Sequence, residues 1–249
     1  MNRHFVSFRN ALAFCSRIVP PAPFDADGQD MAKAVPWYPA AGITLGAIAA
    51  LPAMFLPQNA AWISAWSYVL LLAWLTRGLH WDGLADLADA CGSNATGERF
   101  WEILKDSRIG AFGVMALLFG VTGMVTVSHE VIKTGQCLPL ILAPAFGRSM
   151  VIALGKLTKT HPASRLATLT QPGTHGKTAT LSFAAALVVS CAGVGLISFL
   201  SAALFASLVL VTLGRIARNH GGSNGDFYGT AIITGEIALL LGSALQTTA

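Results

Sequence analysis

Six acidic residues lie between Asp82 and Asp106, in the one long polar stretch of an otherwise apolar chain. The first three, Asp82, Asp86 and Asp89, are spaced i, i+4 and i+7, so in a helix they share one face. Carboxylates on one face repel each other unless a positive charge lies among them. Magnesium takes oxygen ligands and completes its shell with water and substrate phosphates. The spacing therefore predicts a divalent-cation site on this face.

The polar residues that follow extend this prediction to a polyphosphate site. They are Lys105, Asp106, Ser107 and Arg108. Carboxylates would hold the metal, and the basic side chains would meet phosphate oxygens as charge develops in phosphoryl transfer. A solvated loop whose acids balance its own bases is the simpler interpretation. Trp81, Leu84 and Leu87 argue against it, because they make the segment amphipathic and place it against apolar neighbours, where unpaired carboxylates are costly.

The elements around this segment are predicted to be membrane helices. Hydrophobic residues make up 54% of the 249 residues, charged residues 11%, and the mean hydropathy is +0.61. We expect an all-α, polytopic integral membrane helix bundle with about seven transmembrane helices, in a single domain over 1–249 that includes a cytoplasmic catalytic segment, 80–110. The predicted spans are 35–56, 60–79, 111–132, 137–155, 179–195, 197–214 and 228–245.

Lysine and arginine predict the orientation. All but Lys133 and Arg148 of the 16 fall on one side of the seven-span arrangement, and short cytoplasmic loops carry such an excess. The amino terminus, the acidic segment and residues 221–226 are therefore expected in the cytoplasm. A single tilted helix over 179–214 would leave six spans, but it would move Arg215 and Arg218 to the opposite side.

The amino-terminal residues predict an interfacial helix on the cytoplasmic leaflet, stopped by Pro20 and Pro21, with a basic tail as the alternative. Arg9 and Arg17 interrupt the apolar run, which argues against a signal peptide. The four cysteines are scattered and indicate neither a zinc site nor a disulfide framework. No P-loop, dinucleotide fingerprint, internal repeat or nucleic-acid partner is indicated.

Two long motifs carry a resemblance to a known family. Residues 78–89, Gly-Leu-His-Trp-Asp-Gly-Leu-Ala-Asp-Leu-Ala-Asp, and residues 102–113, Glu-Ile-Leu-Lys-Asp-Ser-Arg-Ile-Gly-Ala-Phe-Gly, resemble cobalamin synthases, the adenosylcobinamide-GDP ribazoletransferases. Shorter similarities extend over almost the whole chain. They lie at 13–20, at 37–39 with Gly42, at 143–148, at 221–226 and at Glu236.

The resemblance implies a magnesium-dependent enzyme of the bacterial inner membrane whose active site faces the cytoplasm. It would join adenosylcobinamide-GDP to α-ribazole or its 5'-phosphate and release GMP. The expected attack is by the ribazole 5'-hydroxyl, or its phosphate, on the phosphorus that bears the cobinamide arm. The expected metal ligands and catalytic residues are Asp82, Asp86, Asp89 and Asp106. The expected substrate contacts are His80, Lys105, Ser107, Arg108, Arg148 and Asp226.

Alternatives remain for the function and for several residues. A CDP-alcohol phosphotransferase acting on lipid would use similar aspartates, but Asp86 stands where the arginine of its Asp-Gly-x-x-Ala-Arg pattern belongs. A secondary transporter would show two similar halves, and none is visible. His80 suits an interface equally well, and Arg148 is either a site residue or a charge paired for packing. Gly42 and Gly46 permit helix contacts within the chain or in a homo-oligomer.

Overall fold

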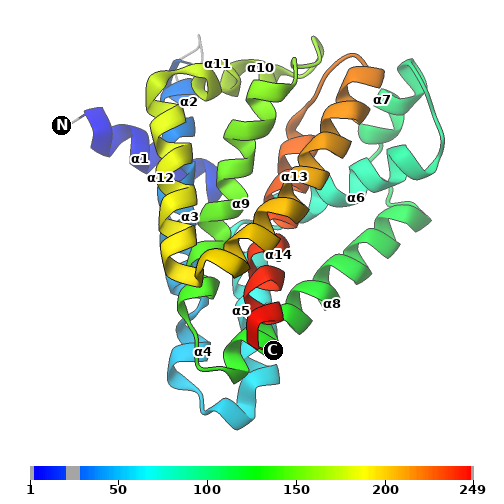
Figure 1. Ribbon diagram of the computed structural model, residues 1–249. Coiled ribbons are helices and arrows are strands. Elements are labelled where there is room, and N and C mark those ends of the chain that lie inside the picture. The colour runs from blue at the N-terminus through cyan, green and yellow to red at the C-terminus, as the bar shows by residue number, and fades with distance from the viewer. Residues whose placement is uncertain (1–2, 21–28, 248–249) are drawn as a thin grey trace.

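The computed structural model describes residues 3–20 and 29–247, and within these ranges the chain forms helices and no strands. Figure 1 shows the bundle. The α-helices are α1 (Arg3–Cys15), α2 (Gln29–Ala34), α3 (Tyr38–Ala49), α4 (Leu51–Phe55), α5 (Ala61–Leu75), α6 (Leu79–Gly92), α7 (Glu98–Leu104), α8 (Ala111–Lys133), α9 (Leu138–Leu157), α10 (Arg165–Thr170), α11 (Pro172–His175), α12 (Lys177–Val194), α13 (Leu196–Asn219) and α14 (Gly225–Thr247), with 3-10 turns at Val35–Trp37 and Gln58–Ala60.

Five of the described helices are long and apolar enough to cross a membrane: α8, α9, α12, α13 and α14. The all-α membrane bundle is therefore confirmed, but the count of seven is not. The first predicted span is divided into α3 and α4, since Pro52 cannot donate a backbone hydrogen bond to the carbonyl of Ile48. The second corresponds to α5, which has only 15 residues.

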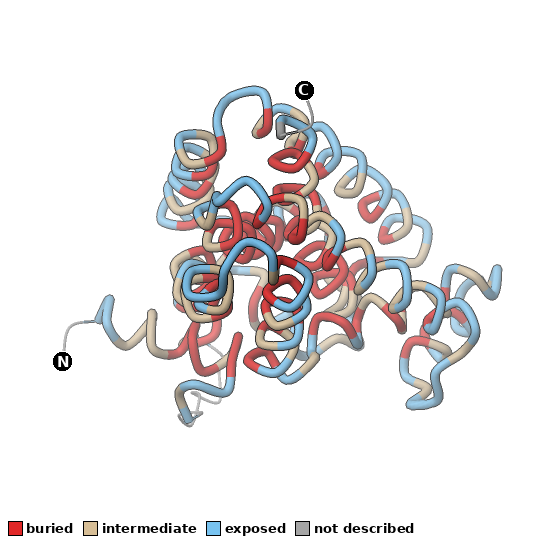
Figure 2. The backbone as a smooth tube through the Cα atoms, turned by 90° about the horizontal axis from the view of Figure 1, so that it is seen from below, coloured by how far each residue is buried: buried red, intermediate tan, exposed pale blue. Residues whose placement is uncertain are grey.

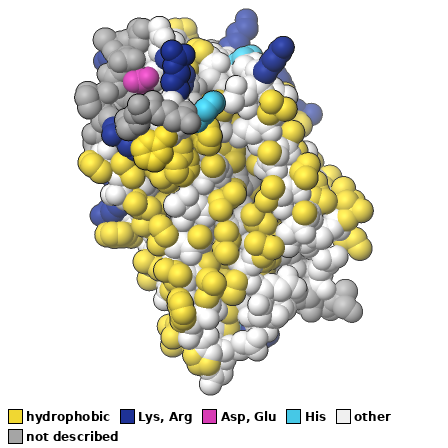
Figure 3. Space-filling model, turned by 90° about the vertical axis from the view of Figure 1, so that its left-hand side faces the viewer, with side chains coloured by type: hydrophobic (Ala, Val, Ile, Leu, Met, Phe, Trp, Pro, Cys, Tyr) yellow, Lys and Arg dark blue, Asp and Glu magenta, His cyan; other side chains and the backbone are white. Residues whose placement is uncertain are grey.

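Helices α9 and α14 form the centre of the bundle. In the 18-residue hydrophobic segment of each helix, 83% of the residues of α9 and 78% of those of α14 are buried, against 22% in α8, α12 and α13. Figure 2 shows this core as buried chain surrounded by exposed helices. The outer helices present large apolar side chains such as Phe119, Leu181 and Leu204, and the face drawn in Figure 3 is mostly hydrophobic along its flank. A lipid environment suits such a surface.

A proline inside α9 is compensated by a tyrosine from α5. Pro144 has no N–H to donate to the carbonyl of Leu140, which would otherwise lack its helical partner. The Tyr68 hydroxyl donates to that carbonyl at 2.8 Å. Gly42 and Gly46 of α3 pack directly on the backbone of α9, where an added Cβ would lie within 2.6 Å of main-chain atoms. These glycines therefore serve a contact within the chain.

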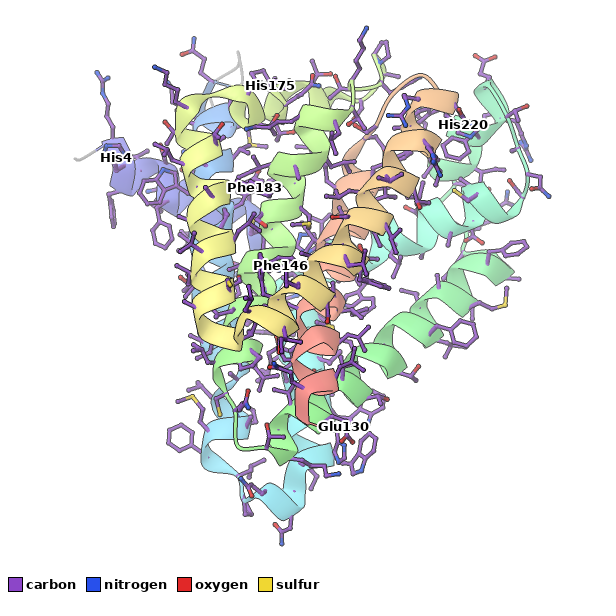
Figure 4. The ribbon with its side chains drawn as sticks, viewed as in Figure 1. His4, Glu130, Phe146, His175, Phe183 and His220 are labelled. Atoms are coloured by element: carbon purple, nitrogen blue, oxygen red, sulfur yellow. The ribbon has the colours of Figure 1, made fainter. Side chains whose placement is uncertain are left out.

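The apolar stretch 179–214 is two helices, as predicted. Gly195 separates α12 from α13 with a φ of 84°, a left-handed conformation that favours glycine. The chain consequently reverses, so that His175 before α12 and His220 after α13 lie at one end of the bundle, while Glu130 of α8 lies at the other (Figure 4).

The predicted amino-terminal helix is present as α1, but it ends earlier than expected. Its last residue is Cys15, and the Ser16 hydroxyl donates to the Leu12 carbonyl at 2.6 Å in the last turn. The prolines therefore do not end the helix, and Pro21 lies outside the described residues. The second half of α1 is buried against the bundle, and Arg77 donates to the carbonyl of Phe14 at 3.2 Å.

Candidate active site

Helix α6 carries the first three aspartates and packs between α8 and α14. It follows α5 after a tight turn in which Arg77 and Gly78 both have positive φ. Its buried side includes His80, Trp81, Ala85 and Leu87, while Asp82 is exposed and Asp86 and Asp89 are partly buried. The predicted amphipathic helix with its acids on the less buried side is therefore present.

The first turn of α14 lies directly against α6. A Cβ added at Gly83 would lie 2.8 Å from the Cα of Asp226, and the Thr230 hydroxyl donates to the Gly83 carbonyl at 3.2 Å. Asn224 holds Asp226 in place: its Oδ1 accepts from the Asp226 backbone N–H at 3.2 Å, and its Nδ2 donates to Asp226 Oδ2 at 2.6 Å. Because residue 83 is glycine, the backbone of Asp226 can approach the turn of α6 that carries Asp82.

Asp82 lines two cavities beside α6, which also share Leu79. The first, of about 120 Å³, has mainly apolar walls from α1, α3, α6, α9, α10 and α14, with Asp82 and Asp226 among its lining residues. The second is an open groove of about 450 Å³. It is lined by Asp82, Asp86, Arg77 and Ser107, together with apolar residues of α6 and α8. One carboxylate can therefore face ligands bound in both.

The four carboxylates Asp82, Asp86, Asp89 and Asp226 lie close enough to affect each other. Burial, together with the negative charges of Asp82, Asp226 and Asp89, raises the pKa of Asp86 to about 7. A bound cation would oppose this effect. Among residues 3–20 and 29–247 no group of three or more His, Cys, Asp or Glu side chains is arranged so that it could hold a metal ion, so a cation here would need oxygen ligands beyond these side chains.

Asp89 has a partner that the spacing did not reveal. Its two oxygens accept the backbone N–H groups of Gly110 and Gly113 at 2.7 and 2.8 Å, at the amino terminus of α8. A negative charge stabilises that end of a helix. An added Cβ at Gly110 or Gly113 would lie 2.4 Å from the Asp89 carboxylate. In the sequence, only the two glycines of Gly-Ala-Phe-Gly, residues 110–113, could have indicated this contact.

Asp106 is also paired, within its own turn. Arg108 donates its backbone N–H and its Nε to Asp106 Oδ1, each at 3.0 Å, and its Nη2 to Oδ2 at 2.7 Å. These bonds lower the pKa of Asp106 to about 2. Ser107 lines the groove, whereas Lys105 and Arg108 are exposed beside it. The structure therefore places Asp82 with Asp86 in the groove and Asp82 with Asp226 in the cavity, while Asp89 and Asp106 have partners of their own. The four-ligand set stays a prediction.

Arg148 lies inside the bundle and lines neither cavity. It is fully buried and forms an ion pair with Glu236 of α14, whose partner was unknown from the sequence. Its Nη2 lies 3.5 Å from His80 Nδ1. A buried arginine needs such a partner, because an unpaired charge is very costly there. His80 itself lines the apolar cavity, and the predicted substrate contact of Arg148 stays a prediction.

The comparisons with known proteins agree with the resemblance. A family model described as cobalamin-5-phosphate synthase matches residues 7–244. Proteins named adenosylcobinamide-GDP ribazoletransferase are similar over nearly the whole chain. One from Nitratidesulfovibrio vulgaris (strain Miyazaki F) is 43% identical over 93% of this chain and 92% of its own length. One from Klebsiella pneumoniae (strain 342) is 35% identical over 94% and 98%, respectively. No solved structure matches. The chain belongs to the cobalamin-5-phosphate synthase family.

Proposed function

We propose that this protein is the enzyme that joins adenosylcobinamide-GDP to α-ribazole or its 5'-phosphate, releasing GMP and completing the nucleotide loop of cobalamin. The family and the names of its relatives support the reaction. The observation that carries the site is the position of Asp82, which lines both an apolar cavity and an open groove that also contains Asp86, Arg77 and Ser107. Two different substrates can therefore meet at one carboxylate.

Magnesium fits the residues of this site. Asp82, Asp86 and Asp226 offer oxygen ligands alone, and their mutual repulsion favours a cation. Magnesium usually keeps water and phosphate oxygens in its shell, so the donor pyrophosphate would supply the remaining ligands. When bound, the ion would neutralise the pyrophosphate charge and stabilise the departure of GMP. Asp89 and Asp106, which already have partners, would not bind the ion but would hold the neighbouring backbone in place.

The groove would hold the donor. It is larger than the cavity, and Arg77 and Ser107 line it, whereas Asp226 does not. Exposed Lys105 and Arg108 lie in the adjoining turn and are available to the nucleotide phosphates. Arg108 would bind phosphate only by sharing its charge with Asp106.

The chemical step is an in-line displacement at the phosphorus that carries the cobinamide arm. A ribose hydroxyl oxygen forms the new P–O bond, the pyrophosphate P–O bond breaks, and GMP leaves with the bonding electrons. A carboxylate that lines the groove, Asp82 or Asp86, would accept the hydroxyl proton. A product that retains a 5'-phosphate requires a ribose oxygen other than the 5'-oxygen to attack, which corrects the attack by the 5'-hydroxyl expected from the sequence.

The cytoplasmic leaflet of the inner membrane is the proposed location. The described helices are those of a multi-pass membrane protein. The basic residues lie mostly on the side that contains the acidic segment, and a nucleotide-linked donor would be encountered there.

Turnover of the purified protein in liposomes tests the function. We expect magnesium-dependent GMP release that requires both adenosylcobinamide-GDP and α-ribazole or its phosphate. CDP-linked lipid donors with a lipid acceptor form the parallel arm. Release of CMP in that arm, with none of GMP in the first from a folded sample, would refute the assignment in favour of a CDP-alcohol phosphotransferase.

A further inference from the structure

The apolar cavity has the chemistry of a site for an aromatic ring. Phe14 and Tyr38 stack at one wall with ring centroids 5.7 Å apart and planes 7° apart. Val151 and Ile232 add aliphatic walls, and Asp82 and Asp226 add the acidic lining. At about 120 Å³, its size is comparable with the roughly 150 Å³ apolar cavity that binds benzene.

The Tyr38 hydroxyl is an independent sign of a ligand. Tyr38 lines the cavity and is only 2% exposed. Among the described residues its hydroxyl finds no hydrogen-bond partner. A buried polar group left unpaired costs about 1–3 kcal/mol, so natural structures seldom keep one without a role. An acceptor atom on a molecule in the cavity would provide the missing bond.

We infer that this cavity, the Tyr38 pocket, binds the benzimidazole base of the acceptor, with the Tyr38 hydroxyl donating to a polar atom of α-ribazole. The inference rests on the proposed function and assigns the two substrates to the two cavities that Asp82 lines. The fused ring lies against Phe14 and Tyr38, and the ribose lies toward Asp82 and Asp226. This orientation brings the ribose hydroxyls to the carboxylate that the groove shares.

The chemistry of the two substrates favours this assignment. The acceptor base is a flat, uncharged aromatic ring, which gains free energy by leaving water for apolar walls. The donor carries a pyrophosphate and a bulky corrin ring, and a cavity of this size cannot enclose them. Bound in this way, the base is excluded from the charged groove, so the substrates do not compete for one surface.

A Tyr38→Phe variant tests the pocket, with Tyr68→Phe as the matched control. Both tyrosines are buried, but the Tyr68 hydroxyl donates to the Leu140 carbonyl away from the cavity. For Tyr38→Phe we expect the KM for α-ribazole to rise about threefold to tenfold, because one hydrogen bond is lost, while the KM for the donor stays unchanged. Tyr68→Phe should leave both KM values unchanged and lower thermal stability instead.

Two further measurements separate the pocket from the reaction. Free benzimidazole should inhibit the wild-type protein competitively against α-ribazole and not against the donor. Binding of α-ribazole alone, measured by calorimetry in nanodiscs without donor, should weaken in Tyr38→Phe and not in Tyr68→Phe. If turnover is absent but this binding difference is found, the proposed function fails and the pocket remains. If α-ribazole binding is the same in both variants, or if Tyr38→Phe changes the donor KM instead, the pocket assignment is overturned.

Discussion

The carboxylates of the site differ in what they already bind, and this decides what each can do. Asp89 accepts two backbone N–H groups, and Asp106 accepts three bonds from Arg108. Asp82 lines both cavities. We therefore propose that Asp82, with Asp86 and Asp226, carries out the reaction, although all five residues are aspartates.

Asparagine substitutions should separate these roles. Asp82→Asn is expected to lower kcat by about 10³-fold or more, since catalysis of phosphoryl transfer is mainly positioning and charge stabilisation. Asp106→Asn should lower it by about tenfold or less, because that carboxylate is paired within an exposed turn. Steady-state GMP release measures both, with Glu130→Gln at the opposite end of the bundle as the control. Equal losses at positions 82 and 106 would contradict this division.

Magnesium affinity should depend on pH near neutrality. The metal needs the ionised carboxylate, and the pKa of Asp86 is raised to about 7. At pH 6 about a tenth of these groups would be ionised and at pH 8 about nine tenths, so affinity should be about tenfold lower at pH 6. Magnesium titration of the substrate-free protein at both pH values measures this. An equal affinity at pH 6 and 8 would exclude Asp86 as the titrating ligand, and Asp86→Asn should remove the dependence.

At the scale of the elements, the site depends on how closely α14 crosses α6. The crossing places Asp226 beside Asp82, although the two are far apart in the chain. It is possible because residue 83 has no side chain and because Thr230 bonds to its carbonyl.

Gly83→Val should therefore separate the two helices. The added atoms would collide with the Asp226 backbone, and overpacking of this kind costs about 1–3 kcal/mol. We expect a lower unfolding temperature and a loss of kcat beyond that explained by the folded fraction, since Asp226 moves relative to Asp82. Gly123→Val on α8 is the control, because no atoms lie within 4 Å of its added Cβ. Full activity in folded Gly83→Val would show that the close approach is not required.

The ion pair between Arg148 and Glu236 links α9 to α14 and supports His80 of α6. Arg148→Met alone should destabilise the fold by about 3–5 kcal/mol, because it leaves Glu236 buried without a partner. Adding Glu236→Leu should recover most of that stability. Thermal unfolding in nanodiscs compares the three proteins. A double variant no more stable than the single one would indicate that Arg148 acts through other contacts.

The sequence predicted some elements well for physical reasons. The long apolar runs and the glycines near 193–195 are local signals, and α12 and α13 follow them. The shared face of Asp82, Asp86 and Asp89 follows from helix geometry. The partners of Asp89, Arg148 and Glu236 could not be read, because each contact joins helices whose packing is settled only in three dimensions. The Tyr38 pocket was missed for the same reason.

At the scale of the whole molecule, the helices bring most basic residues to the end that carries the active site. The first two predicted spans are shorter helices, so the number of crossings is not settled by length. Because α9 is long enough to cross the membrane, we still predict that the turn at 134–136 and the loop at 161–164 lie on opposite sides of it. They are at opposite ends of α9.

Epitope insertion checks this orientation. A short tag inserted after Gly135 should be accessible to antibody in intact spheroplasts, whereas one inserted after Pro162 should need permeabilised membranes. The positive-inside rule is the reason, since the basic loops remain in the cytoplasm. Inserted proteins that retain GMP release make the comparison valid. The reverse labelling would place the acidic segment outside and would contradict the proposed location.

The position of Asp82 in the lining of two cavities has a consequence for the reaction cycle. In the proposed arrangement each substrate occupies one cavity, but the product is a single molecule that reaches into both. It behaves as a bivalent ligand, held by two weak sites at a high effective concentration. Such a ligand dissociates only when both ends are free at once. Release of the cobalamin product, rather than the chemical step, would then be rate-limiting for turnover.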